Sequence, residues 1–244
     1  MLNKPAISDG SWRESHKSAV SSAYAPGQKR RQGHRSARIT ALLSEPARYG
    51  ESAEFIGTLK TANGEPVASR ELRFEESRDG KSWPPYYDSW ALTSNDGEFL
   101  VRSPNALLTT RYFRMRFAGD TELPPAISPV FVVKPTAGLS APAVPATAEV
   151  NSSFASSCFL RPHHKEHTYP VVIRCYRRER QPSGVYEFVY KKSVRAKAHD
   201  LSGGSTCRAA ISLGSRGWWR LRVYHAEDSR NAKTFSGYGY IRVQ

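Results

Sequence analysis

One strand pattern occurs twice in this chain. Residues 112–117 read Tyr-Phe-Arg-Met-Arg-Phe, and residues 218–223 read Trp-Trp-Arg-Leu-Arg-Val. In both copies apolar side chains alternate with arginines, which is the period of two expected of a strand that buries one face. Each copy is followed by an Asp, a Ser and a final β-rich run. Because the copies stand about one small-domain length apart, they predict two tandem β-domains of one architecture.

The alternation also predicts which side chains are buried. We expect the apolar positions of both copies to face a core and the arginines to project outward. The expected core residues are Phe113, Met115, Phe117, Trp219, Leu221 and Val223, and the expected outward residues are Arg114, Arg116, Arg220 and Arg222.

Turn signals divide the rest of the chain into short alternating runs. Asn63-Gly64 and Asp96-Gly97 are typical tight turns, and no run has a helical period of any length. This spacing is typical of antiparallel sandwiches. The predicted fold is all-β, with two tandem antiparallel Ig-like β-sandwich domains behind a disordered basic N-terminal tail. The predicted parts are a tail (1–37), a sandwich (38–135), a Pro/Ala-rich linker (136–148) and a second, basic sandwich (149–244).

The net charge of +14 is unevenly distributed. Residues 1–38 hold 8 Lys/Arg and 2 Asp/Glu, residues 39–135 hold 11 and 13, and residues 136–244 hold 17 and 7. A polyanionic partner should therefore meet the second domain or the tail. The basic run 28–38 is interpreted as a disordered linker in preference to a polyanion-binding arm or a transit sequence.

Eight basic residues concentrate on two predicted strands that flank one hairpin, with tyrosines between them. If the strands pair, the charges form a patch that suits polyanions such as nucleic acid, teichoic acid or acidic polysaccharide. The alternative is solubilising charge that protects sheet edges. The residues are Arg174, Arg177, Arg178, Arg180, Lys191, Lys192, Arg195 and Lys197.

Four aromatic residues surround Pro84-Pro85. Such a loop can stack on sugars or anchor a protein partner, but the favoured interpretation is that it plugs one end of the sandwich. The residues are Trp83, Tyr86, Tyr87 and Trp90.

Three histidines, His163, His164 and His167, share the turn 162–168. They suggest a zinc or copper site, but no spaced Cys/His set completes one. An exposed polar loop is the favoured interpretation, and no metal or other cofactor is assigned.

The three cysteines all lie in the second predicted domain. Cys158 and Cys175 flank the histidine turn, so a disulfide across neighbouring strands is favoured if the chain is exported. Otherwise they are small buried thiols. Cys207 is then the free cysteine.

No complete catalytic set is visible. The chain has no nucleophile elbow, Walker loop, dinucleotide fingerprint or zinc-protease helix, so we expect no enzymatic activity. It also has no run of ~18 apolar residues, so no membrane span is expected. No secretory signal is visible at Met1, which favours either a cytoplasmic chain or a signal upstream of this start.

Several turn and strand motifs carry a family resemblance. Gly57-Thr58-Leu59, Asp96-Gly97-Glu98-Phe99 and Phe117-Ala118-Gly119-Asp120 resemble bacterial Ig-like sandwich repeats of secreted and cell-surface proteins, notably of actinobacteria. Cys158–His163 and Gly217–Arg220 are similar to the module that often follows such repeats. The resemblance covers about residues 38–244 and implies a fold and a setting, not a reaction.

Two functions follow as expectations. The first is a non-enzymatic structural or binding module of a bacterial surface or secreted protein, acting as a spacer, in adhesion or in ligand docking. Its partner would be a cell-wall or other polyanionic polymer, or a protein. The alternative is an intracellular polyanion- or nucleic-acid-binding protein that acts in the cytoplasm through the basic second domain and tail.

Overall fold

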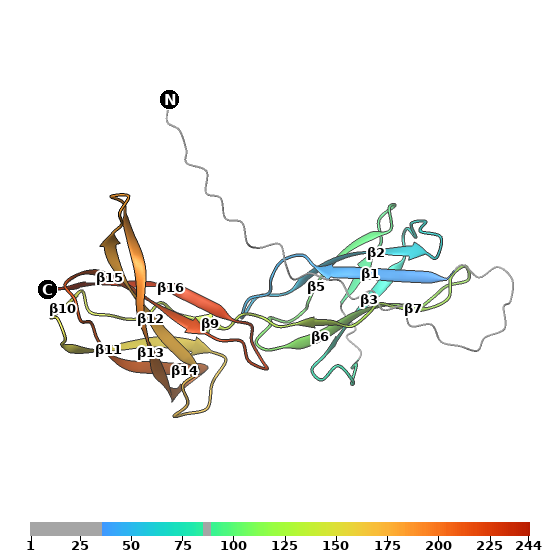
Figure 1. Ribbon diagram of the computed structural model, residues 1–244. Coiled ribbons are helices and arrows are strands. Elements are labelled where there is room, and N and C mark those ends of the chain that lie inside the picture. The colour runs from blue at the N-terminus through green and yellow to red at the C-terminus, as the bar shows by residue number, and fades with distance from the viewer. Residues whose placement is uncertain (1–35, 85–88) are drawn as a thin grey trace. The chain divides into compact units, whose positions relative to one another are not determined.

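The computed structural model describes residues 36–84 and 89–244. Within these ranges the chain is all-β, with sixteen strands and no helix (Figure 1). The all-β prediction is therefore confirmed. Almost all of the predicted tail, residues 1–35, and Tyr86 and Tyr87 of the aromatic loop lie outside the described residues.

The first β unit consists of two sheets. One sheet has the order β1-β2-β5, and the other has the order β4-β3-β6-β7 with β8 also paired to β6. The strands are β1 (Ala37–Leu43), β2 (Glu54–Thr61), β3 (Glu71–Ser77), β4 (Trp90–Leu92), β5 (Glu98–Arg102), β6 (Arg111–Phe117), β7 (Ala126–Ile127) and β8 (Phe131–Val133).

Side chains from both sheets form one apolar core in this unit. Phe55 of β2 packs against Phe74 of β3 and Phe113 of β6, with ring centroids 5.3 and 5.1 Å apart. All three rings are fully buried. Tilted aromatic contacts of this kind add to the stabilisation that burial provides.

The second β unit is a single eight-stranded sheet. Its order is β10-β16-β15-β12-β13-β14-β11-β9, and all pairs are antiparallel except β10 with β16. The strands are β9 (Gly138–Leu139), β10 (Thr147–Ala148), β11 (Ser153–Arg161), β12 (Val171–Arg180), β13 (Tyr186–Leu201), β14 (Gly204–Ser212), β15 (Gly217–His225) and β16 (Thr234–Val243).

The long strand β13 makes this sheet curl around a core (Figure 1). Its first part, through Ala196, pairs with β12, and its last part, from Lys197, pairs with β14. Both halves of the sheet contribute to one core, for example Ile173 of β12 and Ile211 of β14. The two β units therefore share the antiparallel class but differ in sheet topology.

The segment 136–148 departs from the predicted linker. β9 pairs with β11 and β10 pairs with β16, while Ala137 is buried in the second core. Its prolines keep the segment extended, but its backbone also completes the second sheet.

The burial expected from the repeated strand is confirmed. All six apolar residues are buried, as the alternating patterns of β6 and β15 show. Arg114 and Arg116 lie on the opposite face of β6, where both form ion pairs with Glu75. Arg220 and Arg222 lie on the outer face of β15.

The Ser and the Asp that follow the repeated strand also recur, at an offset two residues longer than the 106 residues between the strand copies. The hydroxyl of Ser128 accepts a hydrogen bond from the Met115 amide, and Ser236 accepts one from the Val223 amide, both at 2.9 Å. Asp120 and Asp228 likewise each accept two backbone amides of the turn that follows. Each residue of the second set stands 108 positions after its counterpart.

Candidate functional site

The outer face of the second sheet carries stacked arginines and aromatic rings. Residues directly opposite each other on antiparallel strands share a face. The register places Arg220 between Tyr240 and Tyr176, and Arg222 between Tyr238 and Arg174. We define the arginine–aromatic face by Arg174, Arg220, Arg222, Tyr176, Phe188, Tyr224, Phe235 and Tyr238.

Each guanidinium on this face lies over at least two rings. Arg220 lies 4.2 Å from the Tyr238 centroid and 4.5 Å from that of Phe188. Arg222 lies 3.8 Å from Phe235, and Arg174 lies 4.3 Å from Tyr224. Such contacts contribute about 0.5–1 kcal/mol each at exposed sites, and they hold the three cations in place.

These three cations have no acidic partner in the described part of the chain. No carboxylate forms an ion pair with Arg174, Arg220 or Arg222 there, whereas Arg114 of the first repeat is paired with Glu75. Arg222 donates to the Tyr176 hydroxyl at 3.3 Å. The Nε atom of Arg220 is buried without a partner in these residues. The face therefore presents fixed, uncompensated positive charge.

The eight basic residues predicted as one patch lie on paired strands, but they divide between two faces. The register puts Arg174, Arg178, Arg180 and Arg195 on the outer face of β12 and β13. Arg178 stacks on Tyr186 at 4.8 Å and Arg195 on Tyr169 at 4.7 Å. Lys197, in the last part of β13, pairs in register with Arg208 of β14.

The other three residues are occupied elsewhere. Arg177 donates to the Arg216 carbonyl and pairs with Glu179, which Lys191 also contacts at 2.8 Å. The hydrogen bond from Lys191 holds the pKa of Glu179 below its usual value. Lys192 donates to the Ser212 carbonyl. Lys191 and Lys192 therefore add little to the charge of the outer face, which Arg220 and Arg222 of β15 supply instead.

The described half of the aromatic loop does not form a single cluster. Trp83 lies under the Arg114 guanidinium, 4.1 Å from ring centroid to cation. Trp90, on β4, is exposed. The described residues thus show one tryptophan in a cation–π contact and one facing solvent.

The histidine turn separates its three members. His163 meets Asp200 at 2.7 Å, and His167 lies beside His199 with ring centroids 6.1 Å apart. Only His164 turns inward and is buried. Its backbone is fixed by Ser205, whose hydroxyl accepts from the His164 amide and donates to the His164 carbonyl.

His164 meets two residues that sequence reasoning did not select for this site. Its Nε2 atom lies 3.3 Å from Nε2 of His225 and 3.4 Å from Oδ2 of Asp228. The Nε2 atom of His225 lies 3.6 Å from Oδ2 of Asp228, so the three atoms form a triangle. Two buried imidazoles and a carboxylate therefore converge as a candidate cation site.

The surroundings shift the pKa values of two members. Burial lowers the pKa of His225 below its usual value, although the nearby Asp228 acts in the opposite direction. Burial alone would raise the pKa of Asp228. Hydrogen bonds from the Asn231 and Arg230 amides, together with the neighbouring histidines, outweigh the effect of burial and hold the pKa of Asp228 below its usual value.

The predicted disulfide partners do not lie on paired strands. Cys158 of β11 and Cys175 of β12 are free thiols on strands that are not neighbours in the sheet. Cys158 instead stands opposite Cys207 of β14. The sequence-based pairing was wrong because it assumed that strands on either side of a turn must pair, whereas β12 joins the other half of the curled sheet.

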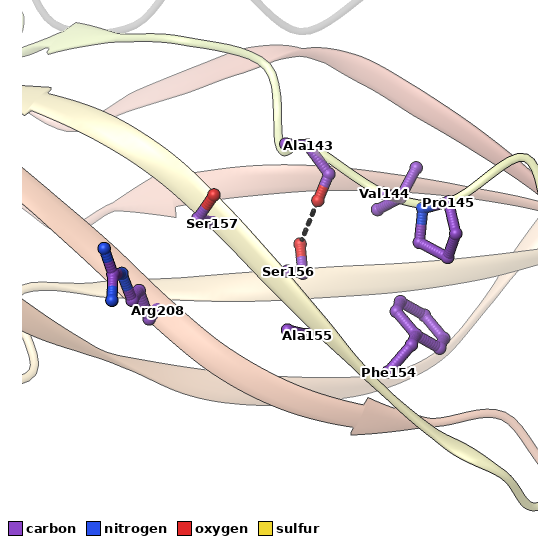
Figure 2. A pocket seen from close by; sticks show the side chains of 8 residues that line it. All are labelled: Ala143, Val144, Pro145, Phe154, Ala155, Ser156, Ser157 and Arg208. Carbon is purple, nitrogen blue, oxygen red and sulfur yellow. Dashed lines mark hydrogen bonds between the residues drawn. The ribbon is translucent and has the colours of Figure 1, made fainter.

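A shallow groove lies between β11 and the segment 143–145 (Figure 2). Ser156 donates to the Ala143 carbonyl at 2.9 Å across it, while Phe154 lies beside Pro145 and Arg208 at the other end. Apart from that arginine, its lining has no titratable group.

Comparisons with known proteins name no family for this chain. No family model matches it, and no curated protein matches it. Among solved structures, a superoxide reductase (neelaredoxin) from Ignicoccus hospitalis is 15% identical, with a TM-score of 0.27 over 43% of this chain and 82% of that one. A TM-score this low supports no inference about fold or function. None of the described residues forms a helix able to cross a membrane.

Proposed function

We propose that this protein is a non-enzymatic binding module that docks a polyanionic polymer on the arginine–aromatic face. Its two β units would be Ig-like modules of the type found in bacterial surface or secreted proteins. The polymer would be a cell-wall polyanion, such as teichoic acid or an acidic polysaccharide.

The observation that carries this proposal is the state of three arginines. Arg174, Arg220 and Arg222 are stacked on aromatic rings, and no carboxylate in the described residues neutralises them. Concentrating like charge on one face costs free energy in the isolated protein. An acidic partner would remove that cost.

The chemistry of the face suits such a partner. Stacking uses the flat side of a guanidinium and leaves N–H donors at its edge, which match phosphate and carboxylate oxygens. Exposed Tyr240 and Phe235 beside them can pack against sugar rings. The excess of Lys/Arg over Asp/Glu in residues 136–244, 17 against 7, would steer a polyanion toward this unit.

A matched pair of variants tests the proposal. Arg174→Gln/Arg222→Gln removes two charges from the face, and Arg208→Gln/Arg216→Gln removes two from elsewhere in the same unit. The full chain is titrated with purified teichoic acid at two salt concentrations. We expect the first variant to weaken binding by at least ~10-fold, the second by far less, and the salt dependence to fall only in the first.

Three results would contradict the proposal. They are equal losses in the two variants, binding that does not depend on salt, and no binding by the wild-type chain. Tighter binding of single-stranded RNA than of teichoic acid would favour the intracellular alternative.

A further inference from the structure

We propose that His164, His225 and Asp228 bind one Zn²⁺ ion through Nε2, Nε2 and Oδ2. This site is separate from the arginine–aromatic face, and it holds whether or not that face binds a polyanion.

The hydrogen bonds around His164 aim a lone pair at the centre of the cluster. Its Nδ1 atom lies 2.8 Å from the Pro162 carbonyl, which can only accept. The proton of the neutral imidazole is therefore on Nδ1, and Nε2 carries a lone pair. A backbone carbonyl behind a histidine is a typical outer-shell partner of a metal ligand.

His225 faces the same point. Its ring is almost completely buried at the end of β15. Nδ1 has no hydrogen-bond partner among the described residues. The Nε2 atoms of both imidazoles and the Oδ2 atom of Asp228 meet within 3.6 Å. Such a meeting requires a cation or a shared proton between them.

The triangle has the dimensions of a zinc site. Zinc binds histidine nitrogen and carboxylate oxygen at about 2.0–2.2 Å, usually in tetrahedral geometry. Ligands of a regular tetrahedron are separated by ~1.63 times the bond length, which gives roughly 3.3–3.6 Å. The observed separations are 3.3, 3.4 and 3.6 Å. Two imidazoles also disfavour calcium and magnesium, which take oxygen ligands.

Asp228 is held in place by its other oxygen. Oδ1 accepts the amides of Arg230 and Asn231, both at 2.7 Å, so Oδ2 is directed to the histidines. About a third of this side chain is exposed, and the fourth ligand position can open to solvent there. The charge of Arg230 opposes a cation, but its guanidinium is directed to the His163 carbonyl.

The first repeat supplies an internal comparison. Asp120, the counterpart of Asp228, accepts two turn amides in the same way, and its Oδ2 atom lies 2.5 Å from Nε of Arg70. In that unit a guanidinium provides the positive charge. At the offset of 108 residues that relates the two aspartates, His225 stands where the first unit has Phe117, and no lysine or arginine of the described ranges forms an ion pair with Asp228. A bound metal ion would supply the charge that Arg70 provides in the first unit.

The experiment uses the full chain, stripped of metal with a chelator and dialysed. Zn²⁺ is titrated by calorimetry, and Co²⁺ by its visible absorption, whose intensity distinguishes four-coordinate from six-coordinate metal. We expect one equivalent at roughly micromolar affinity or better, a four-coordinate Co²⁺ spectrum, and a melting temperature raised by roughly 5–10 °C at saturating Zn²⁺.

Asp228→Asn is the informative variant, because the amide oxygen can still accept the two turn amides while the ligand oxygen is replaced. It should lose at least ~100-fold in Zn²⁺ affinity, since even outer-shell changes cost ~10–100-fold. The control, His163→Ala/His167→Ala, removes two exposed histidines of the same turn. It should still bind one equivalent of Zn²⁺. Circular dichroism verifies that both variants fold. If Asp228→Asn does not fold, His164→Gln provides the second test.

Several outcomes would overturn the proposal. They are no saturable uptake by the wild-type chain, a six-coordinate spectrum, equal affinity in Asp228→Asn, and loss of binding in the control. An absence of uptake would mean that the three groups share only a proton.

Discussion

Cys158 of β11 stands directly opposite Cys207 of β14, and both thiols are buried. The interaction between these two thiols lowers the pKa of Cys207 and, together with burial, raises that of Cys158. Cys175 lies on β12, which is separated from β11 in the sheet by β13 and β14.

Oxidation should therefore join Cys158 to Cys207. Cα atoms of directly opposite antiparallel residues are about 4.5–5.5 Å apart, which lies within the ~4.4–6.8 Å that a disulfide needs. Diamide, which takes two electrons and two protons from a pair of thiols, should yield this bridge and leave Cys175 reduced. Peptide mapping without reductant checks the pairing. A Cys158–Cys175 peptide from the native protein would show that the register is incorrect.

Cys175 should react slowly with alkylating reagents in the folded protein. Burial raises the pKa of its thiol from 9.0 to about 11, although Lys192 acts in the other direction. The thiolate is the reactive form, so at pH 8 the shift alone should slow alkylation by ~100-fold relative to the unfolded chain. Iodoacetamide labelling with and without denaturant, followed by mass spectrometry, measures the ratio. Equal rates in both states would contradict the assignment.

Two adjacent tryptophans give a matched test of the repeated strand. Trp219 faces the core and donates from its indole to the Ser215 carbonyl at 3.0 Å, whereas Trp218 is 46% exposed on the other face. Trp219→Ala should cost ~3–5 kcal/mol of unfolding free energy because it leaves a cavity. Trp218→Ala should cost less than ~1.5 kcal/mol. Urea denaturation of both variants measures the difference, and similar costs would show that the two faces are misassigned.

Local pattern was enough to place most strands. Short runs bounded by turn signals predict strands over 38–43, 54–60 and 98–102, which lie within a residue of β1, β2 and β5. It also assigned the buried faces of β6 and β15. These features depend on neighbours along one strand, which a sequence displays directly.

Relations between distant strands could not be read in the same way. The sequence indicated that residues 174–197 were basic, but not that β15 would place Arg220 and Arg222 beside them. Asp228 was identified only as the Asp that follows the repeated strand, and His225 was not selected, because a turn 61 residues before His225 supplies the third member of their cluster. The strand copies are 106 residues apart and the two aspartates 108, so the repeated strand aligns Phe117 with Val223 and gives no signal at His225.

The closing strand of the first unit shows how one residue changes a repeated element. The sequence predicts a single strand over 126–133, whereas the structure has β7 and β8 with Ser128-Pro129 between them. Proline has no amide to donate to the ladder, so pairing stops there. In the second unit Gly237 follows Ser236, and β16 continues through both.

The two serines should therefore differ in what they contribute. Ser128 is buried, and its hydroxyl is the acceptor for the buried Met115 amide, so Ser128→Ala should cost ~1–3 kcal/mol by leaving that amide unpaired. Ser236 is half-buried, and water can replace its hydroxyl at the Val223 amide, so Ser236→Ala should cost roughly 1 kcal/mol or less. Hydrogen exchange of the two amides, with urea denaturation of each variant, separates local from global effects. The expected result is faster exchange at Met115 in Ser128→Ala and at Val223 in Ser236→Ala. Unchanged exchange at both amides would show that the serine contact is not a shared feature of the two units.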